Sequence, residues 1–142
     1  MDRGAVLVEL ALVLPMLALV FLVVAELGLA IREHQVLQNA AREAARYSAL
    51  PGNLVSPLNP NATLAAIQQR VVTYCQQEQI TITQPPDTIT VDQHHLITIG
   101  SLTVEGSQVT VVHSHPFLLG GAGFLPAGPL TLRANAVFRN MY

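Results

Sequence analysis

The chain contains no lysine and no tryptophan, and only 11% of its 142 residues are charged. Its seven basic residues are all arginines, and nine acidic residues bring the formal net charge to -2. Proteins that bind nucleic acid through its phosphates usually concentrate positive charge on one surface. This composition gives no sign of a basic patch, so we expect no nucleic-acid partner.

Cysteine is nearly absent, because Cys75 is the only one and no disulfide can form within the chain. Cys75 shares the apolar face of a predicted helix with Leu64, Ile67, Val71 and Tyr74, which favours a buried small side chain over a nucleophile. The sequence also lacks a glycine-rich phosphate loop, a nucleophile elbow and, in its globular part, a closely spaced carboxylate pair. We therefore expect neither an enzyme nor a bound cofactor.

Apolar residues are in excess, and they gather at the N-terminus. Hydrophobic residues make up 51% of the chain, and the mean hydropathy of +0.43 is high for a freely soluble domain. Between Ala5 and Ile31 only Glu9 and Glu26 are charged. A run of this length can cross a bilayer, but a carboxylate at membrane depth costs a few kcal/mol. Glu9 therefore needs an explanation.

This run is predicted to be the first part of one long helix, because from residue 5 to about residue 49 only Pro15 and Gly28 interrupt good helix formers. Such a helix is roughly 65 to 70 Å long, about twice a bilayer core, so its second part lies outside the membrane. Pro15 is expected to kink it or loosen one turn. The second part carries apolar residues at helical spacing, suited to packing on a sheet or a helix: Ile31, Val36, Leu37, Ala40, Ala41, Ala44, Ala45 and Tyr47.

The remaining sequence predicts an α+β fold. After a turn-rich linker, a second helix capped by Asn61 or Thr63 should run to about Glu78. From Ile80 onward apolar and polar residues alternate, as in strands with one buried face. We expect an antiparallel meander with helices on one face, with strands around Ile80 and Ile82, Ile89 and Val91, Ile97 and Ile99, Val109 and Val111, and 130–138, and turns at 84–87, near Gly100 and at 105–107.

Histidines are the only candidate metal ligands that the spacing brings out. His113 and His115 would share one face of a strand, and His94 or His95 from a neighbouring strand could supply a third ligand. No acidic or cysteine ligand is fixed by the spacing. We therefore favour exposed histidines at strand ends and expect no metal.

Three interpretations of the apolar N-terminus are open. It could be a cleaved secretory signal, with the small residues Gly28 and Ala30 before the cleavage point. It could also be a plain single-pass anchor for an extracytoplasmic binding domain. The third interpretation, a prepilin, gives Glu9 a role and follows from a resemblance.

The stretch RGAVLVEL resembles the processing site of type IV prepilins, in which a short polar leader ends in glycine and the apolar helix carries glutamate at its fifth position. Cleavage between Gly4 and Ala5 would make Glu9 the fifth residue. Over residues 3–50 the chain resembles TadE-like proteins, the minor pseudopilins of the tight adherence (Flp) pilus system. Glu9, the Leu14-Pro15 pair and the block Ala40–Arg46 carry this match.

The resemblance implies a pilin-like structural or assembly subunit in the bacterial inner membrane, with its C-terminal domain extracytoplasmic, and at the cell surface if it enters a filament. The implied partners are a prepilin peptidase, copies of itself or other pilins, the inner-membrane assembly machinery and the lipid bilayer. Glu9 would pair with the Ala5 amino group of a neighbouring subunit, and Pro15 would belong to the same assembly segment. Positive charges flanking the helix oppose this orientation, so it depends on the resemblance alone.

The predicted organisation has four parts: a leader at 1–4, an apolar transmembrane and assembly helix at 5–31, its extracytoplasmic half at 32–50, and a globular domain at 51–142. In the third part Arg42 and Arg46 lie four residues apart on one helical face, beside Glu43. These three charges either dock the helix on the sheet or form a solvated face with weak local ion pairs. We expect the docking role.

Overall fold

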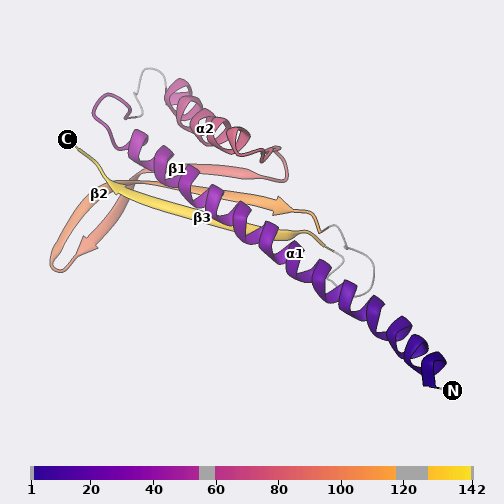
Figure 1. The fold of residues 1–142 in the computed structure, drawn as a ribbon. Helices are drawn as coiled ribbons and strands as arrows, with labels where there is room; N and C mark the ends of the chain where they lie inside the picture. The colour runs from indigo at the N-terminus through magenta and orange to yellow at the C-terminus, as the bar shows by residue number, and fades with distance from the viewer. Residues whose placement is uncertain (1, 55–59, 118–127, 142) are drawn as a thin grey trace. The chain divides into compact units, whose positions relative to one another are not determined.

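A computed structural model describes residues 2–54, 60–117 and 128–141 of the chain. Its elements follow the order α1 (Asp2–Ser48), α2 (Pro60–Gln77), β1 (Thr88–Ile99), β2 (Leu102–His115) and β3 (Leu130–Arg139) (Figure 1). The predicted α+β class is confirmed. By its internal contacts the chain divides into two compact units, an N-terminal unit of residues 1–32 and a C-terminal unit of residues 33–142.

The N-terminal unit is the apolar part of α1. The helix continues through Pro15, and this stretch is long and apolar enough to cross a membrane. Its large apolar side chains are exposed: Val6, Leu7, Val8, Leu10, Leu12, Val13, Leu14, Met16, Leu17, Val20, Phe21, Leu22, Val24, Leu27, Leu29 and Ile31. Ile31 is 59% exposed, so its predicted place on the buried face was wrong.

The C-terminal unit contains one antiparallel sheet in the order β1-β2-β3. Val111 on the central strand lies opposite Ile89 of β1 and Ala134 of β3. Burial alternates along β2 and β3, as predicted for a sheet with one buried face. The predicted antiparallel meander is confirmed, but the strands expected separately around Ile89 and Ile97 are one strand, β1.

The second half of α1, together with α2, covers the buried face (Figure 1). Small side chains on α1 allow close packing, and the core is formed by Val36, Leu37, Ala40, Ala41, Ala44, Ala45, Ile67, Val71, Cys75, Ile80, Ile89, Val109, Val111, Leu132, Ala134 and Ala136. At the edge of the sheet, the backbone carbonyls of Arg133 and Asn135 bond to His34 Nε2 at 3.2 Å and Gln38 Nε2 at 2.6 Å. Side chains of α1 therefore cover part of the open edge of β3.

The ends of α2 correct two predictions. The helix begins at Pro60, which suits a first helical turn, so Asn61 and Thr63 lie inside the helix and neither caps it. At the other end, Ile80 N-H donates to Cys75 O at 2.8 Å and Gln79, with φ of 64°, lies in the left-handed region. This is a Schellman motif, in which the residue after the left-handed position packs its apolar side chain on the core. Ile80 is buried for that reason, and the strand predicted around Ile80 and Ile82 is absent from the described residues.

Gly106 corrects a third prediction. The expected turn at 105–107 does not form, because β2 runs through it and Gly106 pairs with His95 on one side and Arg139 on the other. A Cβ at position 106 would collide with Ile97 Cδ1 and lie 2.7 Å from the carbonyl oxygen of Phe138. Glycine is needed here for close approach within the sheet, which is a common reason for glycine inside a strand. The turn predicted near Gly100 is present.

Gly106→Ala is expected to lower the free energy of unfolding by about 1 to 3 kcal/mol, because the new methyl group must displace a backbone carbonyl as well as a side chain. Urea unfolding of the detergent-solubilised chain, followed by circular dichroism, measures this change. Gly128→Ala is the matched control, since no described residue lies within 4 Å of the added Cβ. Equal stability of the two variants would contradict the close-approach explanation.

Candidate functional site

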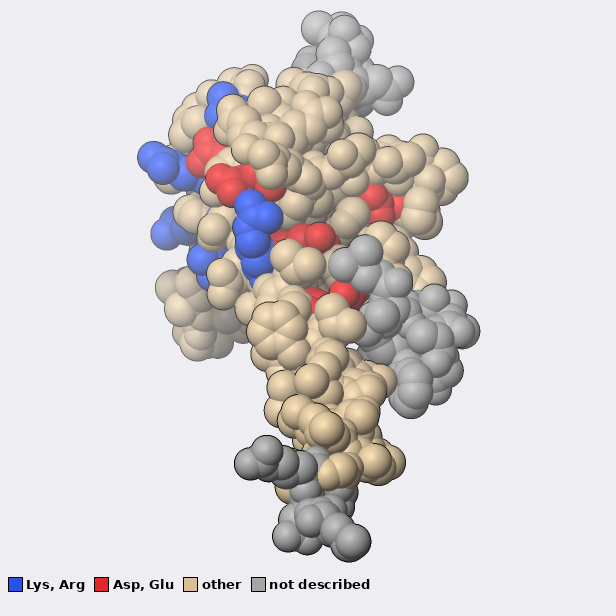
Figure 2. Space-filling view, turned by 45° about the vertical axis from the view of Figure 1, so that its right-hand side comes forward, with Lys and Arg blue, Asp and Glu red and all other residues tan. Residues whose placement is uncertain are grey.

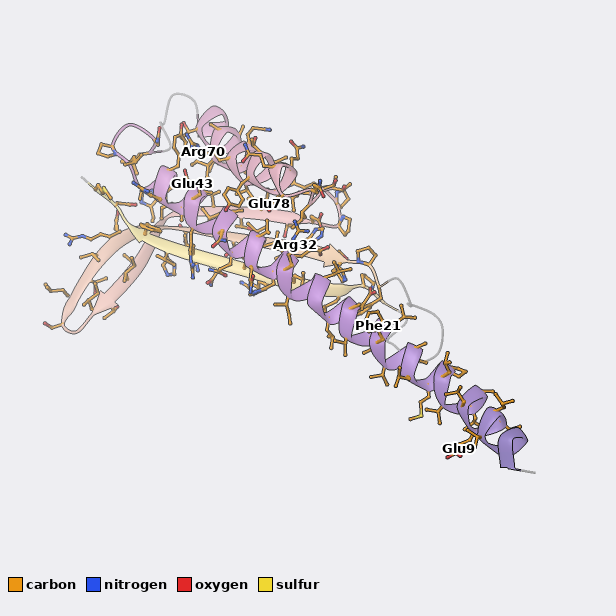
Figure 3. All side chains as sticks on the ribbon, in the orientation of Figure 1. Glu9, Phe21, Arg32, Glu43, Arg70 and Glu78 are labelled. Atoms are coloured by element: carbon orange, nitrogen blue, oxygen red, sulfur yellow. The ribbon has the colours of Figure 1, made fainter. Side chains whose placement is uncertain are left out.

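Glu9 is exposed on α1 within the N-terminal unit (Figure 3). It is the only charged residue from position 4 to position 25, and its neighbours Val8 and Leu10 are exposed apolar side chains. Gly4 and Ala5 lie inside α1, and Gly4 is exposed, whereas the side chain of Ala5 is outside the described residues. The exposed apolar surface of α1 suits lipid or neighbouring helices, and Glu9 is its one polar group over these residues.

Arg42, Glu43 and Arg46 lie on the part of α1 that belongs to the C-terminal unit. Glu43 pairs with Arg70 of α2, with Arg70 Nη1 to Glu43 Oε1 at 3.1 Å (Figure 3). The Arg70 guanidinium also stacks 4.1 Å from the centre of the Tyr47 ring. Glu43 therefore connects α1 to α2, where we had expected a contact with the sheet.

The side chains of Arg42 and Arg46 are exposed, and neither has a hydrogen bond or ion pair with another residue in the described part of the chain. Instead, the alanines of α1 pack on the sheet, and His34 and Gln38 bond to its edge. The structure gives the two arginines no docking contact within their own unit.

The two histidine pairs lie far apart on the sheet. His95 lies opposite Gly106 of β2, and His113 is seven residues further along that strand, about 23 Å away at 3.3 Å per residue. His94 and His95 are close to Glu105 and Asp92, at 3.5 and 3.9 Å. The spacing excludes one metal site built from both pairs.

His113 and His115 are buried, with 8% and 5% of their surfaces exposed, so the prediction of exposed histidines is wrong for this pair. They interact with two carboxylates that sequence reasoning did not identify. His113 Nδ1 lies 3.0 Å from Asp87 Oδ2, and His115 Nδ1 lies 2.7 Å from Glu33 Oε2. The second nitrogen of His113 is 3.7 Å from the same Glu33 oxygen.

Asp87 is 3% exposed, and its carboxylate also accepts hydrogen bonds from the backbone N-H groups of Thr83 and Ser114, each at 2.9 Å. A buried carboxylate is tolerable when donors surround it in this way. Together, Glu33, Asp87, His113 and His115 connect α1, the loop before β1, and β2. The hydrogen bonds of this histidine and carboxylate cluster hold these three elements together. Within the described ranges no group of three or more His, Cys, Asp or Glu side chains could hold a metal ion.

Cys75 is fully buried, as predicted. Burial, with a smaller contribution from the Asp87 carboxylate, raises the pKa of the Cys75 thiol from 9.0 to about 11. The thiol is therefore protonated at neutral pH and is not a nucleophile.

The comparisons with known proteins agree with the resemblance found in the sequence. The family model described as TadE-like protein matches residues 4–46. This match includes Gly4, Glu9, Pro15 and the block from Ala40 to Arg46, and it ends before α2 and the sheet. No curated protein and no solved structure matches the chain. The resemblance to TadE-like proteins is thus confirmed for residues 4–46. The family model does not cover α2 and the sheet, so their fold is known from the structure alone.

Proposed function

We propose that this chain is a pilin-like structural or assembly subunit of a bacterial Flp (tight adherence) type IV pilus, inserted in the inner membrane by α1 and packed through it into a filament or assembly complex. The observation that carries the proposal is Glu9, a lone carboxylate on the exposed apolar surface of α1, inside the segment that matches TadE-like proteins.

The apolar part of α1 suits both environments that such a subunit meets. In the bilayer its leucine and valine side chains face lipid, and in an assembly they face neighbouring helices. The transfer from lipid to helices gains little from water exclusion, so close packing must hold the helices together. The alanines and aliphatic residues between Ala5 and Ala30 provide that packing.

Glu9 supplies the specificity that apolar packing lacks. A carboxylate in apolar surroundings costs a few kcal/mol on its own, and an ammonium group does as well. Cleavage after Gly4 would create an ammonium group on Ala5, and pairing it with Glu9 of a neighbouring subunit would make both charges tolerable. Because the pair forms at only one separation, it would also fix the axial register between subunits.

The intact mass and N-terminal sequence of the chain, recovered from cells with an active prepilin peptidase, test the proposal. We expect the mature chain to start at Ala5, and Gly4→Leu should keep Met1 in place. Gly28→Ala is the control, since nothing lies within 4 Å of its added Cβ and it lies far from the proposed cleavage point. A chain that keeps Met1 despite an active peptidase would contradict the cleavage step and favour a single-pass anchored binding domain.

A further inference from the structure

The hairpin formed by β1 and β2 is longer than β3. Arg139, the last residue of β3, lies opposite Gly106, so among the described residues no third strand lies beside the hairpin from Leu96 to Glu105 (Figure 1). Both strands keep their register there, from the pair of Leu96 with Glu105 to the pair of Ile99 with Leu102. A two-stranded ribbon alone is marginally stable in water.

This projecting hairpin carries large exposed apolar side chains. Leu96, Ile99 and Leu102 are 62 to 69% exposed. Ile99 and Leu102 lie opposite one another on the face of the sheet turned away from the helices, and Leu96 is on the other face. An apolar surface on a ribbon without a covering layer is typical of an interface.

Carboxylates flank the apolar part of this hairpin. Asp92 and Glu105 have side chains that are 53% and 46% exposed. Both are close to histidines of the same hairpin, and those contacts leave about half of each side chain open to solvent. The hairpin therefore combines an apolar tip with a negatively charged base.

A second surface has the complementary character. Arg133 and Arg139 are exposed on the outer face of β3, on either side of the partly exposed Val137. On α1, His34 and Gln38 bond to the β3 edge. Arg42 and Arg46 follow them at intervals of four residues, so they lie on the same side of the helix.

These four arginines therefore lie along one edge of the unit, here called the arginine edge. None of their guanidinium groups has a hydrogen bond or ion pair with another described residue. In Figure 2 most of the arginines gather on one side of the view. Exposed Leu130, Val137 and Met141 add apolar area to this edge.

We propose that the projecting hairpin of one copy docks on the arginine edge of a second copy. Ile99 and Leu102 would pack against Val137 and its apolar neighbours. Asp92, on the same face, and Glu105, which lies opposite Leu96 on the other face, would meet arginines, whose planar guanidinium groups suit carboxylates. The two surfaces are different: the hairpin projects at one end of the sheet, whereas the arginine edge follows β3 as far as Arg139, opposite Gly106 at the base of the hairpin. Because the two surfaces differ, the contact can repeat from copy to copy, so it builds a ring or an open row of subunits.

This inference deepens the proposed function by naming the contact that the globular units would make, and it depends on that function for bringing copies together. This contact would determine which surfaces of neighbouring globular units meet, a selectivity that the apolar helix does not provide. A surface ion pair alone contributes little, so the apolar side chains must supply most of the affinity and the charges must select the orientation.

Disulfide cross-linking between two differently tagged full-length copies tests the contact. One copy carries Ile99→Cys and the other Val137→Cys, both with Cys75→Ala, and they are expressed together in membranes. We expect a mixed dimer on oxidation. Ile99→Cys with Gln69→Cys, on an exposed position of α2, should give none. Failure of the first pair to cross-link would overturn the inference.

A second experiment exchanges the charges at two exposed positions, Arg139 and Glu105. Arg139→Glu on the Val137→Cys copy should lower the cross-linked fraction severalfold, and Glu105→Arg on the Ile99→Cys copy should restore it. Loss without restoration would contradict the predicted orientation. Co-purification of the two tagged copies is measured in parallel. If the copies co-purify in a Glu9-dependent way but the hairpin does not cross-link, this inference fails and the proposed function stands.

Discussion

Replacing Glu9 with alanine should nearly abolish incorporation of the chain into filaments or assembly complexes, while its insertion in the membrane continues. The substitution makes the apolar stretch of α1 more apolar, so membrane insertion is not impaired. Removing one partner of a buried ion pair costs about 3 to 5 kcal/mol, which corresponds to a loss of roughly 100-fold or more in association. Co-purification of two tagged copies from membranes, together with the sheared cell-surface fraction, measures this loss.

Two further variants separate charge from shape at position 9. Glu9→Gln keeps the size of the side chain but removes its charge, and we expect it to fail almost as completely as Glu9→Ala. Val8→Ala, at the neighbouring exposed position, should assemble normally. Normal assembly of Glu9→Gln would show that a hydrogen bond is sufficient and would refute the pairing of Glu9 with an ammonium group.

The features that depend on local sequence pattern were predicted well. The long helix, the alanine-rich buried face around Ala40 and Ala44, and the alternating burial of β2 and β3 all follow from periodicity, because the periods of helix and strand differ. The segment resembling TadE-like proteins was also found correctly, since its signals lie close together in residues 4–46.

Predictions that depended on distant partners were less complete. His113 and His115 were correctly placed on one face of a strand, but Glu33 and Asp87 reach them from 82 and 26 residues away. No spacing rule brings these acids together with the histidines. Glycine likewise indicates either a turn or a close approach, and only the position of Phe138 O shows which applies at Gly106. The burial of Ile80 in a Schellman motif was also missed. The left-handed residue of this motif is Gln79, so the glycine that usually indicates such a helix end is not in the sequence there.

Removing the buried carboxylate of Asp87 is expected to destabilise the C-terminal unit strongly. Asp87→Ala leaves the N-H groups of Thr83 and Ser114 and the imidazole of His113 without their acceptor. Buried donors that lose their only acceptor, together with the lost bond to the His113 imidazole, predict a loss of about 3 to 5 kcal/mol in the free energy of unfolding. Urea unfolding of the detergent-solubilised chain, followed by circular dichroism, measures it.

Asp92→Ala is the matched control, because Asp92 belongs to the same sheet but its side chain is 53% exposed and bonds mainly within its own hairpin. We expect it to lose less than about 1 kcal/mol. If Asp87→Ala were equally mild, the cluster would not be what connects α1 to the sheet. A double-mutant cycle with His113→Ala isolates the pair, and a coupling free energy of about 1 kcal/mol or more would show that Asp87 acts through His113 in addition to the two backbone groups.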